Sequence, residues 1–110
     1  MSSKCWAIMD AKTGGLIGSK KGNKKREIAS LTKMMTCLCV CKLIKQYNIA
    51  PKSIYIQVSK YAASMGGTSA DLQRKDVVSI WDLMHALMLP SGNDAAISLA
   101  ERSGTYIYLK

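Results

Sequence analysis

The segment Ala29-Ser30-Leu31-Thr32-Lys33 opens a long apolar stretch, residues 31–46. Because this stretch is apolar nearly all round, we expect a central helix that packs against neighbours on most sides. Ser30 fits the start of such a helix, where a serine hydroxyl commonly accepts a hydrogen bond from a first-turn N–H. Lys33 fits poorly, since a cation in the first turn faces the positive end of the helix dipole at a cost of about 0.3–1 kcal/mol.

The pairing of Ser30 with Lys33 suggests chemistry in addition to helix capping. Three positions along a helix place both side chains on one face, so the hydroxyl and the amine can meet. Burial and the helix dipole favour a neutral lysine amine, and a neutral amine can take a proton from a hydroxyl. The placement of Lys33 therefore suits a general base acting on Ser30.

Short strands are expected on both sides of the central helix. Residues 5–9 and Leu16–Lys20 flank a turn that contains Asp and paired Gly, which predicts an N-terminal hairpin. Residues 54–58 alternate apolar and polar side chains in the two-residue period of a strand. Together with the helices, these elements predict an α+β fold with two or three short strands.

The last third of the chain predicts two helices joined by a polar turn. Ser79 is placed as an N-cap, and apolar residues follow at helical spacing until Pro90 ends the helix. Ser91-Gly92-Asn93 then makes a tight turn. The second helix begins at Asp94 and is expected to end at Gly104, which reads as a glycine stop.

The formal charge of +9 belongs to the N-terminal half of the chain. Residues 1–60 carry twelve Lys and Arg against two acids, whereas residues 61–110 carry four against five. The densest basic segment, residues 20–26, contains Gly and Asn and predicts a turn projecting into solvent. The alternative is a polyanion site, but no aromatic residue interleaves the charges as single-strand binding would favour.

Composition places the chain among globular domains. A length of 110 residues with 48% hydrophobic and 21% charged residues predicts one domain, residues 1–110. No apolar run approaches the roughly 20 residues of a membrane-spanning helix. The first residues lead directly into a strand-like run, so no signal peptide is expected.

The four cysteines suggest a reducing compartment, since no signal peptide accompanies them. Cys37, Cys39 and Cys41 alternate within the predicted helix, where Cys37 and Cys41 share a face and Cys39 points elsewhere. Three convergent thiolates are therefore improbable, and we expect no metal site. We interpret these cysteines as small buried hydrophobic residues.

Two short motifs carry a family resemblance. Ser-x-x-Lys, Ser-x-Asn and Lys-Thr-Gly form the signature of class A β-lactamases and penicillin-binding proteins, and Ser30, Lys33, Ser91 and Asn93 match the first two elements. The surrounding segments closely resemble the serine D-alanyl-D-alanine carboxypeptidases among the low-molecular-weight penicillin-binding proteins. Four segments carry this resemblance in the family's order: residues 6–14, 27–36, 62–69 and 87–96.

The resemblance implies a fold and a role for each matching residue. The fold would be part of the serine β-lactamase/penicillin-binding (DD-peptidase, transpeptidase-like) fold, with an N-terminal hairpin and a helical region. Ser30 would be the nucleophile that attacks between the two terminal D-alanines of a peptidoglycan stem peptide, with Lys33 as its base. Ser91 would pass a proton to the departing D-alanine, and Asn93 would hold the substrate amide. β-Lactams would be inhibitors, and no cofactor is implied.

The third motif does not match. Lys12-Thr13-Gly14 precedes Ser30 and reads as the hairpin turn, whereas the family's catalytic Lys-Thr-Gly follows Ser-x-Asn. Residues 103–110 also depart from the family's sequence. We therefore expect an N-terminal fragment that lacks the C-terminal strands of the sheet, the lysine that would anchor the substrate carboxylate and one oxyanion-hole donor. Loss of one such donor typically reduces turnover by about 100–1000-fold.

Two other classes of function compete with the enzyme. One is an inactive remnant or interaction protein that keeps the helical part of the fold. The other is a helix-turn-helix nucleic-acid binder built from residues 80–104. Its recognition helix would carry Asp94 and Glu101 against only Arg102, which is the wrong sign for phosphate contacts. We therefore expect no nucleic acid among the partners.

We predict that any affinity for nucleic acid is weak, salt-sensitive and confined to residues 20–26. Charge reversal at Lys24 and Lys25 should abolish it, because the attraction is electrostatic. Filter binding at several salt concentrations checks this. Tight binding that survives about 0.2 M salt, or that prefers a base sequence, would restore the helix-turn-helix hypothesis.

Overall fold

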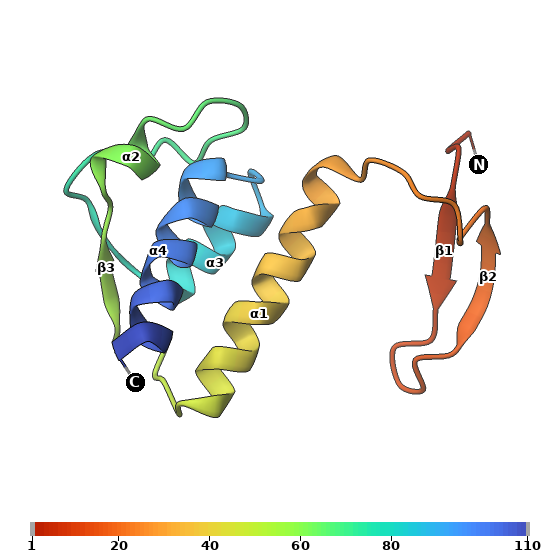
Figure 1. Ribbon diagram of the computed structural model, residues 1–110, viewed down its shortest axis with the longest axis horizontal. Helices are drawn as coiled ribbons and strands as arrows, with labels where there is room; N and C mark the ends of the chain where they lie inside the picture. Colours follow the sequence, from red (N-terminus) through yellow and green to blue (C-terminus); the bar gives the residue numbers. More distant parts are fainter. Residues whose placement is uncertain (1, 110) are drawn as a thin grey trace.

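The computed structural model describes residues 2–109 and has an α+β architecture with two separate two-stranded sheets. Its elements in chain order are β1 (Trp6–Met9), β2 (Leu16–Lys20), the 3₁₀ turn η1 (Ala29–Leu31), α1 (Thr32–Gln46), β3 (Tyr55–Gln57), α2 (Lys60–Ala63), β4 (Val77–Ser79), α3 (Ile80–Met88) and α4 (Asn93–Leu109). Figure 1 shows α3 and α4 side by side, with α1 next to them and β3 beside α4.

The predicted N-terminal hairpin is confirmed. Strands β1 and β2 pair antiparallel from Trp6 opposite Lys20 to Met9 opposite Leu16. The turn is built on Asp10, whose carboxylate accepts backbone N–H bonds from Lys12 at 2.8 Å and Thr13 at 3.1 Å. Lys12-Thr13-Gly14 therefore lies in the hairpin turn, as the sequence indicated.

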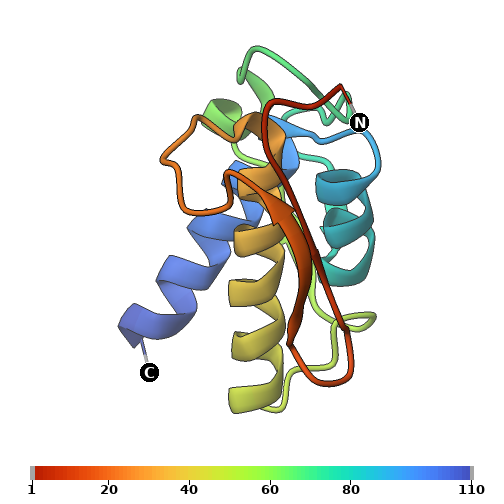
Figure 2. The same ribbon diagram turned by 90° about the vertical axis from the view of Figure 1, so that its right-hand side faces the viewer.

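The hairpin stands apart from the helices. Figure 1 separates it from α1, and Figure 2 shows its strands running alongside the α1 axis. Its apolar side chains are largely uncovered, with exposed fractions of 43–68% for Ile8, Met9, Leu16 and Ile17. The sheet β1–β2 thus contributes none of the fully buried core.

The core lies among the helices and the second sheet. Strands β3 and β4 pair antiparallel, with Ile56 opposite Val78. The fully buried apolar side chains come from all four helices, from β3 and from the residue after it: Val40, Ile56, Val58, Ala62, Ile80, Leu83, Leu87, Ala95 and Leu99. The hydrophobic effect therefore holds α3 against α4 and anchors α1 and β3 on that pair.

The expectation that α1 packs on most sides is wrong. Only Val40 of this helix is fully buried, whereas Met34, Met35 and Leu38 are about half exposed. The physical reason is that α3 and α4 contact one face of α1 only, and the hairpin does not cover the other. The cysteines follow the same pattern, so our interpretation of them as buried is also wrong: Cys39 and Cys41 are exposed and Cys37 is half-buried.

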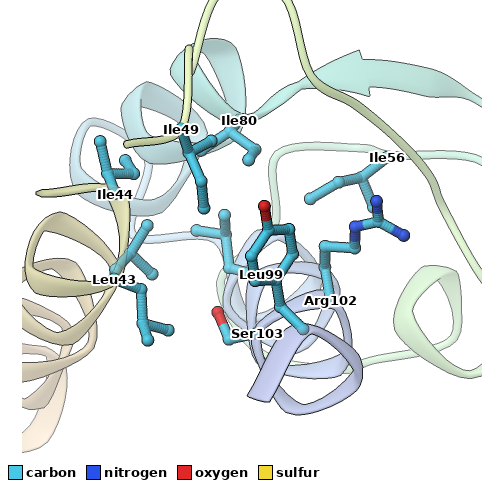
Figure 3. Close-up of a pocket in the computed structure, with 10 residues that line it drawn as sticks. Leu43, Ile44, Ile49, Ile56, Ile80, Leu99, Arg102 and Ser103 are labelled. Atoms are coloured by element: carbon cyan, nitrogen blue, oxygen red, sulfur yellow. The ribbon is translucent and has the colours of Figure 1, made fainter. Parts of the chain in front are cut away.

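The predicted stop at Gly104 is wrong as well, because α4 continues through it to Leu109. A glycine inside a helix costs only about 1 kcal/mol relative to alanine, which packing can offset. Figure 3 shows Leu99, Arg102 and Ser103 of α4 lining an apolar pocket with side chains of α1 and β3. One turn later Tyr106 lines the same pocket, and its ring lies 5.3 Å from that of Tyr47.

Local signals placed α3 correctly. The Ser79 hydroxyl accepts the Asp82 N–H at 3.1 Å, which is the predicted N-cap, and the helix ends at Met88 before Pro90. The sequence did not indicate β4 or the short helix α2. A three-residue strand and a four-residue helix are too short to show a clear period.

The segment between α2 and β4, residues 64–76, is tied to the start of α4 by one carboxylate. Asp94 is 1% exposed and accepts hydrogen bonds from the Ser69 hydroxyl at 2.9 Å and from the Ala70 and Leu72 N–H groups at 3.0 Å. Burial alone would raise the pKa of Asp94. The hydrogen bonds from Ala70, Leu72, Ser69 and Ala95 outweigh it, so the pKa lies below its ordinary value.

We predict that the 110-residue chain in isolation has low stability or self-associates. The uncovered faces of the hairpin and of α1 expose apolar surface and unpaired strand edges, and two strands alone are marginally stable. Sedimentation and thermal melting test this expectation. A monomer with a sharp transition above about 65 °C, beyond the usual mesophile range, would contradict it.

We also predict that Asp94 stabilises the fold in a pH-dependent way. Its folded-state pKa lies below the unfolded value of about 3.9, so its contribution is fully present above about pH 4 and is lost as the pH falls through the folded-state pKa. The melting temperatures of the wild type and of Asp94→Asn should therefore converge as the pH falls below about 4. A difference that stays constant down to acid pH would contradict this assignment.

Candidate active site

Ser30 lies in the 3₁₀ turn that precedes α1, on a surface-exposed position. The cap positions of η1 and α1 are Ile28 and Leu31, and neither helix start receives a side-chain hydrogen bond. Within residues 2–109, the Ser30 hydroxyl makes no hydrogen bond. Ser30 is therefore not an N-cap, and the capping explanation of this residue is wrong.

The backbone just before Ser30 is strained. Ala29 has a φ of +48°, a left-handed conformation that costs a residue with a Cβ atom about 1–2 kcal/mol. The chain turns here from the extended linker into the 3₁₀ turn, which presents the hydroxyl to solvent. Strain of this kind is found preferentially at functional sites, where the surrounding structure maintains it.

Lys33 and Ser91 are brought together across 58 positions of sequence. Lys33 Nζ, in the first turn of α1, donates to the Ser91 hydroxyl at 3.0 Å, and the bond is partly buried. In the part of the chain that the structure describes, no bond joins Ser30 to either residue. The structure thus pairs Lys33 and Ser91 directly. Within residues 2–109, it does not bond Ser30 to either of them.

The turn that carries Ser91 has little freedom. Ser91 has a φ of +56°, and its carbonyl oxygen accepts a bond from the Thr68 hydroxyl. At Gly92 an added Cβ would lie 2.6 Å from a carboxylate oxygen of Asp94 and 3.0 Å from the carbonyl of Ala86. A glycine is therefore required between Ser91 and Asn93 by close approach.

Asn93, the first residue of α4, directly follows the turn that carries Ser91. Its N–H donates to the Thr68 carbonyl at 2.8 Å, and its side-chain Nδ2 donates to the Gly66 carbonyl at 2.9 Å. These bonds orient the amide and leave its Oδ1 without a partner among residues 2–109. The oxygen is thus available to accept an N–H from a bound ligand. Gly67 fits closely beside it, because a Cβ there would lie 2.7 Å from Nδ2.

Gly66 and Thr68 are site residues that the sequence analysis did not single out. The resemblance of residues 62–69 to the family was the available signal, but it assigned no role to any residue in the segment. Their contacts join positions 23–27 residues apart, and such pairings leave no periodic trace in a sequence.

The site offers four polar groups. They are the exposed hydroxyl of Ser30, the amine of Lys33, the Ser91 hydroxyl to which that amine is hydrogen-bonded, and the oriented amide oxygen of Asn93. A serine hydroxyl can donate and accept at once, so Ser91 can relay a proton between Lys33 and a third group. No group of three His, Cys, Asp or Glu side chains suited to a metal ion occurs within residues 2–109.

Comparison with known protein families finds one match along almost the whole chain. The family model described as D-alanyl-D-alanine carboxypeptidase, peptidase family S11, matches residues 1–106. Among curated proteins, D-alanyl-D-alanine carboxypeptidase DacD of Escherichia coli K12 is 34% identical over 102 residues. That match covers 87% of this chain and 26% of the relative.

Solved structures agree with the sequence relatives. The D-alanyl-D-alanine carboxypeptidase DacD of Francisella tularensis superposes with a TM-score of 0.85 at 36% identity, over 96% of this chain and 25% of that one. Penicillin-binding protein 6B of Escherichia coli superposes with a TM-score of 0.78 at 33% identity, over 89% of this chain and 32% of that one. The expected fold class, part of the penicillin-binding fold, is therefore confirmed.

The chain matches only part of each relative. The chain spans about a quarter to a third of the length of these relatives. None of the helices in residues 2–109 is both long enough and apolar enough to cross a membrane. The family model, the sequence identities and the superpositions agree, and the chain belongs to the D-alanyl-D-alanine carboxypeptidase family of peptidases.

Proposed function

We propose that this chain carries the acylating part of a serine-type D-alanyl-D-alanine carboxypeptidase, with Ser30 as nucleophile. The hydrogen bond of 3.0 Å between Lys33 Nζ and Ser91 Oγ carries the proposal, because it links two motifs that sequence alone left 58 positions apart. The Ser30 hydroxyl supports the proposal, because it is exposed and caps neither η1 nor α1. A structural serine at a helix start would instead be expected to cap that helix.

In the proposed reaction, Ser30 Oγ forms an ester bond to the carbonyl carbon of the penultimate residue of the substrate. The C–N bond to the terminal D-alanine breaks. Lys33 Nζ takes the proton from Ser30 Oγ, and Ser91 relays a proton from Lys33 to the departing nitrogen. Water then hydrolyses the ester, which releases the shortened peptide and restores Ser30.

Asn93 and the Ser30 backbone complete the proposed roles. The free Oδ1 of Asn93 would accept an amide N–H of the substrate and so align the scissile bond. The N–H of Ser30 would supply one oxyanion-hole donor. Residues 94–110 contain no Lys-Thr-Gly, the motif that would supply the second donor and the carboxylate anchor.

The names of the relatives support the proposed substrate class. They are D-alanyl-D-alanine carboxypeptidases and penicillin-binding proteins. The substrate proposed for this chain is therefore a peptidoglycan stem peptide that ends in D-Ala-D-Ala. β-Lactams would imitate that substrate and deacylate slowly.

We predict that acylation survives in part while turnover does not. A reactive fluorescent penicillin should label Ser30 slowly, because nucleophile, base and proton relay all lie within the chain. Ser30→Ala should remove the label. Release of D-alanine from a D-Ala-D-Ala peptide should stay near background, since the carboxylate anchor and second oxyanion donor act as charge develops in the transition state.

Mass spectrometry of the labelled peptide and an assay for free D-alanine test these expectations. Ser53→Ala is the matched control, because Ser53 is also exposed and lies in the turn before β3. Label on another residue, or label that survives Ser30→Ala, would show that the nucleophile is misassigned. Release of D-alanine at about 1 per second or faster would show that the absent strand is not required.

A further inference from the structure

Asp94 is unusual among the acids of this chain because its charge is buried. Its side chain is 1% exposed, whereas Asp82, in the equivalent first turn of α3, is exposed. An acid at a helix N-terminus stabilises the helix from the surface, so helix stability alone does not require burial. Burying a carboxylate is costly unless hydrogen bonds replace the lost water.

Most of those hydrogen bonds come from one loop. Oδ1 accepts the Ala70 N–H at 3.0 Å, and Oδ2 accepts the Leu72 N–H at 3.0 Å and the Ser69 hydroxyl at 2.9 Å. The Ala70 N–H also lies 3.2 Å from Oδ2, and a local bond comes from the Ala95 N–H to Oδ1 at 2.9 Å. The carboxylate thus serves as the attachment point for residues 69–72, which lie 22–25 positions earlier in the chain.

The same loop touches the proposed reacting groups at its other end. Thr68 directly precedes the attached residues. Its carbonyl accepts the Asn93 N–H at 2.8 Å, and its hydroxyl donates to the Ser91 carbonyl. Two residues earlier, the Gly66 carbonyl accepts from Asn93 Nδ2. The loop therefore connects Asp94 to both Ser91 and Asn93 by short, bonded steps.

Close packing and strain make this connection rigid. An added Cβ at Gly92 would lie 2.6 Å from Asp94 Oδ1 and 3.1 Å from the Ala70 nitrogen, so the loop, the turn and the carboxylate leave no free space. Asp71 and Ser91 both have left-handed backbone conformations, with φ of +57° and +56°. Such conformations persist only where the surrounding contacts hold them.

We propose that Asp94 is a positioning residue for the proposed acylation site: by holding residues 69–72, it fixes Thr68 and Gly66, and through them Ser91 and the Asn93 amide. This inference rests on the proposed function for its catalytic consequence. Its structural part, the dependence of the Ser91–Asn93 turn on a loop that the neighbouring Asp94 carboxylate holds, stands on the contacts alone. Asp94 itself touches no reacting atom in this mechanism.

The experiment compares Asp94→Asn with Asp82→Asn in the full 110-residue chain. Asparagine has the same shape but presents an NH₂ group to donors that need an acceptor. Asp82→Asn removes the same charge from a first helical turn without touching the loop. The readouts are amide hydrogen exchange at Leu72 and Asn93, exchange at the core residue Leu83, and the rate of Ser30 labelling by a fluorescent penicillin.

Asp94→Asn is expected to speed exchange at Leu72 and Asn93 by about tenfold or more and to slow labelling by about 10- to 100-fold, as for a misplaced reacting group. Exchange at the core residue Leu83 should speed up much less than exchange at Leu72 and Asn93, because it reports only the loss of global stability, and Asp82→Asn should alter none of these rates. Unchanged exchange at Asn93, or equal effects of the two variants, would overturn the proposal.

A second variant separates positioning from a loss of stability. Thr68→Val keeps the backbone carbonyl but removes the hydroxyl that bonds Ser91. If Asp94 acts through Thr68, the double variant should label no more than about twofold more slowly than the worse single variant, because both changes break one path. If the effects of the two variants on the labelling rate multiply, Asp94 and Thr68 contribute independently, and the proposed path from Asp94 through Thr68 is overturned.

Two further outcomes are also decisive. If Asp94→Asn unfolds the chain, Ser69→Ala replaces it, since this change removes a single bond to the carboxylate. If the wild type is not labelled at Ser30, the proposed function fails, and exchange of the Asn93 amide decides the positioning role alone. Exchange that speeds up more at Asn93 than at Leu83 supports that role, and an equal or absent change at Asn93 refutes it.

Discussion

The burial of Leu83, Leu87 and Leu99 between α3 and α4 is the constraint on which the rest of the structure depends. These side chains are at most 1% exposed, and they hold the two helices together so that the turn between them has one position. Helix α1 then packs on the pair through Val40. Since Lys33 lies two turns before Val40 on a rigid helix, its amine reaches Ser91. An apolar core thus sets the position of a polar contact at its edge.

Around that contact, stability and function pull in different directions. Lys33 faces the positive end of a helix dipole, Ala29 and Ser91 have left-handed backbones, and Asp94 is a buried charge. Each feature costs free energy taken alone. All of them lie within a few residues of the two motifs, whereas α3 follows ordinary capping and packing rules. Left-handed backbones also occur at Lys21, Asn48, Asp71 and Lys75, so it is their combination with a buried charge and a first-turn lysine that marks this region.

The helical part of the molecule and the hairpin differ in how completely they bury their apolar side chains. The helical part buries a continuous apolar core. Every buried side-chain nitrogen or oxygen that the structure describes has a hydrogen-bond partner. The hairpin and α1 both leave apolar side chains exposed, among them Ile17 and Met35. The chain spans about a quarter to a third of the length of its relatives. Of the proposed site residues, Lys33, Ser91 and Asn93 lie at the edge of the well-packed part, whereas Ser30 is exposed in the turn before α1. Residues 94–110 contain no Lys-Thr-Gly to supply the second oxyanion donor and the carboxylate anchor of the proposed reaction.

Sequence alone determined the hairpin, the Ser79 cap, the limits of α3 and the four residues of the two motifs, because turns, caps and short helical spacings are set by neighbours in the chain. It did not determine how much of α1 is covered by other elements or that α4 continues through Gly104, since both depend on which surfaces meet. It also did not show that Ser30 caps no helix. The bond from Lys33 to Ser91 and the attachment of residues 69–72 to Asp94 were decided only by the tertiary structure. They join residues 22–58 positions apart. The sequence pattern does not specify the distance between such residues, because that distance is set by the packing of the core.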